Sequence, residues 1–357
     1  MVRFSRSEVG TLGSAALATV AAGIVTHAHV GEVWTFAAAA AALSLLAATV
    51  GAATEQLGHR LGPGATGMLQ AAFGNLPELL ICLFSLRAGL VDVVRSAIVG
   101  AVLANALLVL GLAILVGGLK HGTQRFASEA PRMVATLMLL AVSALAVPTL
   151  AHVLHTPAQA HEVALSAACA VVLLVVFLCS IPFSLSANPA VCAAPEEDTE
   201  SRSHAWPVAQ ALVVLAAAGV AAALASEWFV DALLPATKSI GLSPGFTGLV
   251  IVAIAGNAVE NVVGIRLAAQ NKPDYAMSVI LNSAVQVALA LTPVLVLASF
   301  FVGPTPLTLV LPPLLVAALF LSALVTALVV VDGESIWLEG VALIGLYVMI
   351  AAAFFWG

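Results

Sequence analysis

Two stretches of the chain share one pattern: Gly74-Asn75-Leu76-Pro77-Glu78 in the first half and Gly256-Asn257-Ala258-Val259-Glu260 in the second half. A second pair precedes them, because Pro63-Gly64-Ala65-Thr66-Gly67 corresponds to Pro244-Gly245-Phe246-Thr247-Gly248 at nearly the same offset. Each match falls inside a long apolar segment. Two matches at nearly one offset predict an internal repeat.

The composition places these motifs in a membrane protein. Of 357 residues, 62% are hydrophobic and 8% are charged, and the mean hydropathy is +1.13. An average soluble domain carries about 25% charged residues, so the soluble globular classes are excluded. The net charge of −6 argues against a nucleic-acid partner, which requires basic patches. The four cysteines show neither metal-binding nor disulfide spacing.

The apolar runs predict an all-α polytopic membrane protein with about eleven transmembrane helices, at roughly 20 residues per span. The predicted spans are residues 10–27, 32–54, 62–88, 92–118, 129–150, 159–184, 207–226, 242–268, 275–302, 306–331 and 336–356. Arg3 and Arg6 before a short apolar run also describe a signal peptide. Because no clean small-residue cleavage site follows, we expect the first helix to be retained.

The repeat and the spans together predict the domain organisation. Residues 1–31 form an extra N-terminal transmembrane helix, residues 32–185 and 207–357 form two five-helix repeats, and residues 186–206 form an acidic linker. Because five is odd, the second repeat enters the membrane from the opposite side. Inverted repeats of this kind are typical of secondary transporters that work by alternating access.

Counting lysine and arginine predicts the orientation. One side of the predicted topology collects nine of the twelve basic residues, and the other side collects three. Basic residues are concentrated in cytoplasmic loops. The N-terminus and the linker are therefore expected in the cytoplasm, the C-terminus outside, and the protein in the plasma membrane of a bacterium.

Two glutamates carry the candidate chemistry. Glu78 and Glu260 are the acids that fall well inside predicted spans, they occupy equivalent repeat positions, and no basic residue lies at their depth. Buried ionisable groups are expensive in a bilayer and mark functional sites. One alternative is that each glutamate is protonated and joins helices by hydrogen bonds. The symmetry and the missing counter-charge favour a bound cation.

The neighbouring residues suit a hard cation. Asn75 and Asn257 lie three residues before the two acids, hence on the same helical face, and offer carbonyl oxygens. Gly74, Gly256 and Pro77 weaken the helix there and can free backbone carbonyls. Carboxylate and carbonyl oxygens together resemble a Ca²⁺ site. The lack of deep histidine or cysteine ligands disfavours Zn²⁺ and Cu⁺.

A second polar set lies on the fourth and ninth predicted spans. Its members line the site or form hydrogen bonds between helices, and they are Asn105, Asn282, Ser283 and Gln286. A cluster of three histidines falls on the predicted outer side. These residues have an external metal or proton-sensing role or are simply solvated, and they are His152, His155 and His161.

The two glutamate motifs resemble those of the Ca²⁺/H⁺ antiporters of the CAX family, within the calcium/cation antiporter superfamily. The resemblance continues through Gly100, Asn105 and Gly117-Gly118 in the first repeat and through Gln286 in the second. It implies that Glu78 and Glu260 are the principal cation and proton ligands. The family usually has histidine after the second glutamate, where this chain has Asn261.

Together these features predict a transporter, not an enzyme, that exchanges cytoplasmic Ca²⁺ for external H⁺ at a site built from the two glutamates. Its partners are Ca²⁺, H⁺ and the lipid bilayer, and no cofactor is expected beyond the transported ions. A Na⁺/H⁺ or Na⁺/Ca²⁺ antiporter of the same superfamily is the alternative. A more distant alternative is an intramembrane hydrolase with an acidic dyad, although such enzymes usually employ aspartate. A passive channel is disfavoured because channels are usually rings of subunits.

Overall fold

The computed structural model describes residues 6–61, 73–187 and 206–355, and these residues are almost entirely helical. Within them, nine helices are long and apolar enough to cross a membrane. A tenth span exists if residues Pro244–Gly256 and Asn261–Ala269, which are bent by 63°, are counted together. The third predicted span, 62–88, lies partly outside the described residues, and the Pro63–Gly67 motif and most of the linker lie outside them. The count of eleven and the inversion of the repeats therefore stay predictions.

The helices form two compact units, each drawn from both halves of the chain. The first unit holds residues up to Phe84, Ile181–Leu242 and Ala255–Val259, and the second holds Ser85–Ser180, Ser243–Ile254 and the chain from Glu260 on. Each predicted repeat therefore contributes to both units. The repeat boundaries themselves stay predictions.

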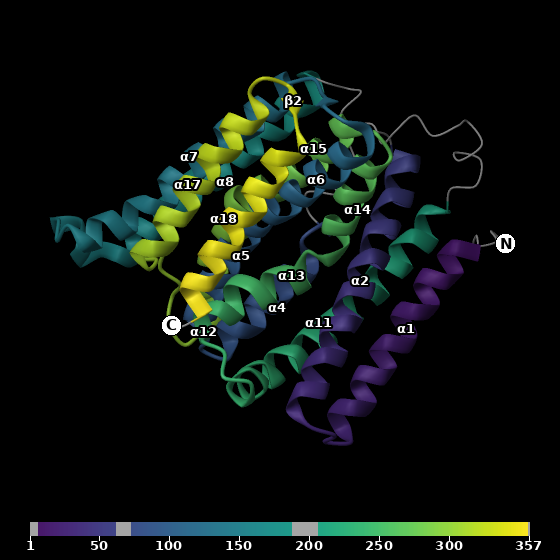
Figure 1. The fold of residues 1–357 in the computed structure, drawn as a ribbon. Coiled ribbons are helices and arrows are strands. Elements are labelled where there is room, and N and C mark those ends of the chain that lie inside the picture. The colour runs from purple at the N-terminus through teal and green to yellow at the C-terminus, as the bar shows by residue number, and fades with distance from the viewer. Residues whose placement is uncertain (1–5, 62–72, 188–205, 356–357) are drawn as a thin grey trace. The chain divides into compact units, whose positions relative to one another are not determined.

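The first unit is built around a pair of long helices. Helix α2 (Glu32–Leu61) packs along α11 (Val208–Ser239), with α1 (Arg6–His27) against both (Figure 1). Buried alanines on α2 and α11 let the two backbones approach closely. At one end Trp206 is buried, and its indole Nε1 donates to Glu8 Oε1 at 3.0 Å while its backbone N–H donates to Gln56 Oε1 at 3.0 Å.

Helix α11 is longer than the predicted span of residues 207–226. It continues to Ser239 and includes exposed Glu227 and Asp231. A span predicted from hydropathy ends at the first charged residues. The helix itself continues for as long as its backbone hydrogen bonds and its packing permit. Helix α4 (Leu76–Arg87) also belongs to this unit as far as Phe84.

The second unit holds most of the remaining helices. They are α5 (Val91–Leu103), η1 (Ala104–Val109), α6 (Leu110–His121), α7 (Glu129–Val153), η2 (Pro157–His161), α8 (Glu162–Ala187), α12 (Pro244–Phe246), η3 (Thr247–Val252), α13 (Ala253–Gly256), α14 (Ala258–Ala269), α15 (Pro273–Gln286), η4 (Val287–Leu291), α16 (Thr292–Val302), α17 (Pro313–Val330) and α18 (Trp337–Phe355). The last turns of α8 and parts of α13 and α14 belong to the first unit. Two short antiparallel strands complete the elements, β1 (Gln124–Arg125) and β2 (Glu334–Ser335).

Loops of the second unit gather at two ends. At one end β1 pairs with β2, and the backbone N–H of Ala127 donates to Asp274 Oδ1 at 2.8 Å. At the other end the hydroxyl of Ser243 donates to the carbonyl of Phe354 at 2.7 Å. Loops gathered in this way agree with spans that alternate in direction. The end that holds β1 and β2 is the one predicted to face the cytoplasm.

Candidate functional site

Glu78 lies in the first turn of α4 and is fully buried in the first unit. Its side chain is 0% exposed, and Asn75, at 8%, lies in the turn that precedes the helix. The carbonyl of Asn75 accepts a hydrogen bond from the N–H of Leu79 at 2.9 Å. Pro77 stands in the first turn of α4, where its missing N–H costs no helical hydrogen bond. The Gly74–Pro77 segment therefore starts a helix and brings a carboxyl group into the protein interior.

The second motif lies directly against Glu78. A Cβ atom built on Gly256 would stand 3.3 Å from Glu78 Cβ and 3.4 Å from its Cγ. The first distance is shorter than ordinary van der Waals contact, so a Cβ atom at this position would require a shift of a few tenths of an ångström. The neighbouring Asn257 is 2% exposed. The structure therefore brings together Glu78 of the first motif and Gly256 of the second.

The second motif also breaks its helix, as the glycine content predicts. Helix α13 ends at Gly256 and α14 begins at Ala258. The 63° bend lies between Pro244–Gly256 and Asn261–Ala269, and so within the motif. Such a break frees backbone carbonyls for a ligand. Glu260 lies in the first turn of α14, and its side chain lies outside the described residues. That Glu78 and Glu260 share a cation stays a prediction.

The second polar set lies in the second unit. Asn105 and Ser283 are 1% and 3% exposed, and Asn105 Nδ2 donates to Ser283 Oγ at 3.1 Å, which links η1 to α15. Asn282 Nδ2 donates to Ser278 Oγ at 3.2 Å within its own helix. Gln286 is the last residue of α15 and is half-buried. For Asn105 and Ser283 the structure shows the interhelical hydrogen bond, and lining of the ion site stays a prediction for all four residues.

Two π-helical turns adjoin this set, and sequence reasoning missed them. Turn η1 contains Asn105, and turn η4 starts directly after Gln286. The separation of the two turns along the chain is nearly the same as that of the glutamate motifs. Short π-helical segments often mark functional sites. That the two turns occupy equivalent positions of two repeats stays a prediction.

Hydroxyl groups bond to the backbone carbonyls of these turns. Thr326 Oγ1 of α17 donates to the carbonyl of Ala106 at 3.1 Å, and Thr292 Oγ1 donates to the carbonyl of Val287 at 2.7 Å. Thr326 and Thr292 are both buried. Nothing in the sequence marks Thr326, because only the packing of α17 places it beside η1.

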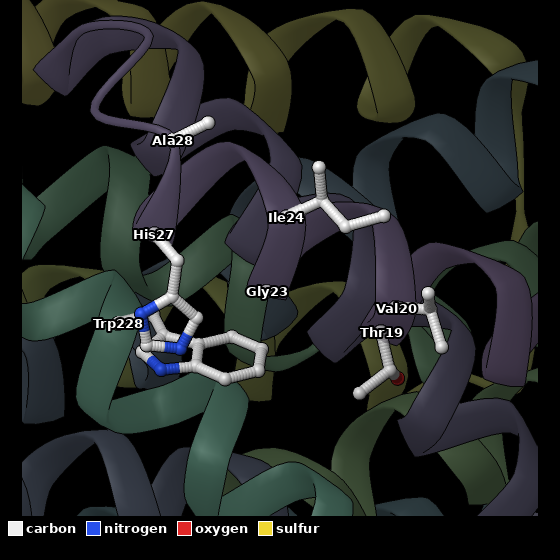
Figure 2. A pocket seen from close by; sticks show the side chains of 7 residues that line it. All are labelled: Thr19, Val20, Gly23, Ile24, His27, Ala28 and Trp228. Carbon is white, nitrogen blue, oxygen red and sulfur yellow. The ribbon is translucent and has the colours of Figure 1, made fainter.

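Two surface hollows are separate from the candidate residues. In the first unit a groove of about 620 Å³ lies between α1 and α11, and Figure 2 shows the rings of His27 and Trp228 against each other there. Their ring centroids are 6.3 Å apart at 77°. A second hollow of about 300 Å³ in the second unit includes Asp92 and Arg95. None of the candidate site residues lines either hollow, and the described residues contain no cluster of three histidine, cysteine, aspartate or glutamate side chains suited to a metal.

Comparison with known proteins assigns the chain to a family of transporters. The model of the sodium/calcium exchanger protein family matches residues 31–186 and 210–356, and the gap between the matches falls at the predicted linker. The Ca(2+)/H(+) antiporter of Aphanothece halophytica is 36% identical over 344 residues, which cover 92% of this chain and 91% of that protein.

Solved structures give the same result. The structure of native YfkE matches with a TM-score of 0.82 and 31% identity over 97% of this chain and 100% of that chain. The H+/Ca2+ exchanger CAX matches with a TM-score of 0.74 over 98% and 92%, and at 17% identity it shows the shared fold alone. Because its relatives are antiporters, the chain is an integral membrane transporter rather than an enzyme. It belongs to the sodium/calcium exchanger protein family.

Proposed function

We propose that the protein exchanges Ca²⁺ for H⁺, moving Ca²⁺ out of the cytoplasm of a bacterium in return for external H⁺. Three proteins named as Ca(2+)/H(+) antiporters are 35–36% identical to the chain. The single observation that carries the proposal is the fully buried Glu78, held against Gly256 of the equivalent motif. A carboxyl group at this depth, in a family of cation exchangers, is suited to bind a transported cation.

The mechanism is competition between two kinds of cargo. Glu78 and Glu260 when ionised bind one Ca²⁺, and when protonated they carry two H⁺. Asn75 and Asn257 supply amide oxygens of the type that Ca²⁺ prefers. The equivalence of the glutamates in the two motifs supports this pairing.

The same competition explains why ions would not leak. Moving an empty site with two ionised carboxylates through a dry intermediate carries a large desolvation cost. Either Ca²⁺ or two protons removes that negative charge, so each half-cycle requires cargo. Asn105, Asn282, Ser283 and Gln286 contribute polar groups along the helices that adjoin the π-helical turns.

A charge-neutralising substitution tests the proposal. Glu78→Gln keeps the size of the side chain and removes one negative charge and one titratable proton site. Losing one partner of a buried charge pair costs about 3–5 kcal/mol, and each 1.4 kcal/mol is tenfold in binding. Ca²⁺ affinity is therefore expected to fall by more than about a hundredfold, and Glu260→Gln is expected to do the same.

The measurement is proton-gradient-driven ⁴⁵Ca²⁺ uptake into liposomes with equal amounts of each purified variant. Glu227→Gln is the matched control, because Glu227 is an exposed glutamate on α11 of the same unit. Near wild-type uptake by Glu78→Gln or Glu260→Gln would show that the two residues are not the joint site. Uptake driven by a Na⁺ gradient and indifferent to the proton gradient would favour Na⁺/Ca²⁺ exchange instead.

A further inference from the structure

A non-helical segment of the second unit, residues 305–311, is held by hydroxyl groups from three helices. We call it the strap. Leu307, Leu309 and Leu311 of the strap are buried and alternate with less buried residues. Their backbone N–H groups donate to the hydroxyls of Ser299 in α16 (2.7 Å), Ser166 in α8 (2.9 Å) and Thr149 in α7 (2.9 Å) respectively. The strap therefore depends on the positions of these three helices.

An ion pair joins two of the same helices directly beside the strap contacts. His152 Nδ1, in the last turn of α7, contacts Glu162 Oε1, in the first residue of α8. His152 follows Thr149 by three residues and Glu162 precedes Ser166 by four, so each member shares a helix face with one strap-binding hydroxyl. The pair thus lies one turn away from both hydroxyls, and it links α7 to α8.

The strap in turn contacts the helix that leads to the polar set. Arg95 of α5 donates from Nε to the carbonyl of Thr308 at 3.1 Å and from its terminal guanidinium nitrogen to Thr308 Oγ1 at 2.6 Å. Helix α5 continues without interruption into η1, which contains Asn105. The helices that carry His152 and Glu162 are therefore linked by hydrogen bonds through the strap to α5, the helix that leads to Asn105.

We propose that the pair His152–Glu162 is a proton-sensitive clasp that orders the strap and so regulates exchange from the predicted outer face. This inference rests on the proposed function in one respect: Ca²⁺/H⁺ exchange is the activity that the clasp would regulate. Imidazole is the side chain that ordinarily changes charge between about pH 5 and 8. A protonated imidazole in such a pair attracts the carboxylate electrostatically, which holds the clasp closed, whereas a neutral imidazole lacks that attraction.

The surroundings of the pair contain few other charges that compete with this switch. His155, whose Nδ1 lies 3.3 Å from Gln159 Oε1, and exposed His161 are the nearby titratable groups on the connecting segment. Helix α17, which packs against α7, carries no charged residue, and Asp274 of α15 bonds to Ala127 at the opposite end of the unit. On the strap side, Arg95 also pairs with Asp92 at 3.1 Å.

The expected effect is modest, because the pair is partly exposed. The side chains of His152 and Glu162 are 44% and 27% exposed, and such pairs change an equilibrium by up to about fivefold. The faster state is the closed clasp, because an ordered strap fixes Arg95 and with it the start of α5.

Amide hydrogen exchange tests the clasp without requiring transport. Protection of the Leu309 and Leu311 amides, corrected with an unstructured peptide of the same sequence, is expected to rise up to about fivefold from about pH 8 to about pH 5. His152→Gln and Glu162→Gln are expected to abolish this rise in protection, and the neighbouring His161→Gln is the control that retains it. The clasp is overturned if amide protection in the wild type does not change with pH, or if the rise remains in His152→Gln.

Transport in liposomes tests the regulation. With the pH varied only on the side of His152, the exchange rate of His152→Gln relative to the wild type should fall from near one at about pH 8 to about one-fifth at about pH 5. A ratio that stays constant overturns the coupling between clasp and exchange. If the protein exchanges no Ca²⁺ for H⁺ at all, the proposed function is wrong. The pH dependence of amide protection then still decides whether the clasp exists.

Discussion

Adding one methyl group beside Glu78 is the sharpest test of the site geometry. Gly256→Ala places a Cβ atom 3.3 Å from Glu78 Cβ and 3.4 Å from Cγ. Contacts this tight force either the carboxylate-bearing side chain or the backbone of α13 to shift by a few tenths of an ångström. Overpacking of a buried site costs about 1–3 kcal/mol, which is about fivefold to about 140-fold in binding. We expect Ca²⁺ affinity, thermal stability or both to fall by this amount.

Gly219→Ala provides the matched control. Gly219 lies in α11 of the same unit, and its added Cβ would stand 3.7 Å from Leu76 Cδ2, at the start of the helix that carries Glu78. That distance is ordinary van der Waals contact, and alanine is favoured over glycine in a helix by up to about 1 kcal/mol. The control should therefore keep wild-type exchange and an equal or higher Tm.

The assay combines Ca²⁺/H⁺ exchange at varied Ca²⁺ concentration in liposomes with a thermal unfolding curve of each variant. If the Glu78 side chain shifts to make room, the KM for Ca²⁺ rises at nearly constant Tm. If the backbone of α13 is displaced instead, the Tm falls as well. Wild-type kinetics together with wild-type Tm in Gly256→Ala would refute the close contact between the two motifs.

Three further predictions concern protons and topology. Apparent Ca²⁺ affinity should fall as the pH falls through the range of carboxylate protonation, because ligands must be deprotonated to bind metal, and a pH-independent affinity would reject a shared site. Asn261→His should alter the pH profile of exchange with nearly unchanged ion selectivity, since the buried Oδ1 of Asn261 has no hydrogen-bond partner among the described residues; an unaltered profile would mean that the position only packs. Cysteines introduced at Ser201 and His155 in a cysteine-free background should be labelled from opposite sides of the membrane, and labelling from one side would contradict the inverted repeat.

Much of the architecture follows from local features of the chain. Apolar runs identify membrane helices because a bilayer admits only segments whose backbone polar groups are bonded internally. The glycine of the second motif locates a weak point of its helix, because the bend lies between Gly256 and Asn261, within that motif. The family follows from the same two motifs, because their residue types and spacing are specific.

Only the tertiary structure decided which of these residues meet. Glu78 lies against Gly256, a residue far away in the chain, and the space between them is tight for a Cβ atom. The bond from Thr326 to the carbonyl of Ala106 likewise depends on how α17 packs beside η1. Hydropathy and motif spacing describe each helix by itself, whereas close contacts depend on the relative positions of helices that are distant in sequence. The sequence by itself therefore determined the membrane helices and the two glutamate motifs, and the fold determined the contacts that surround Glu78 and Asn105.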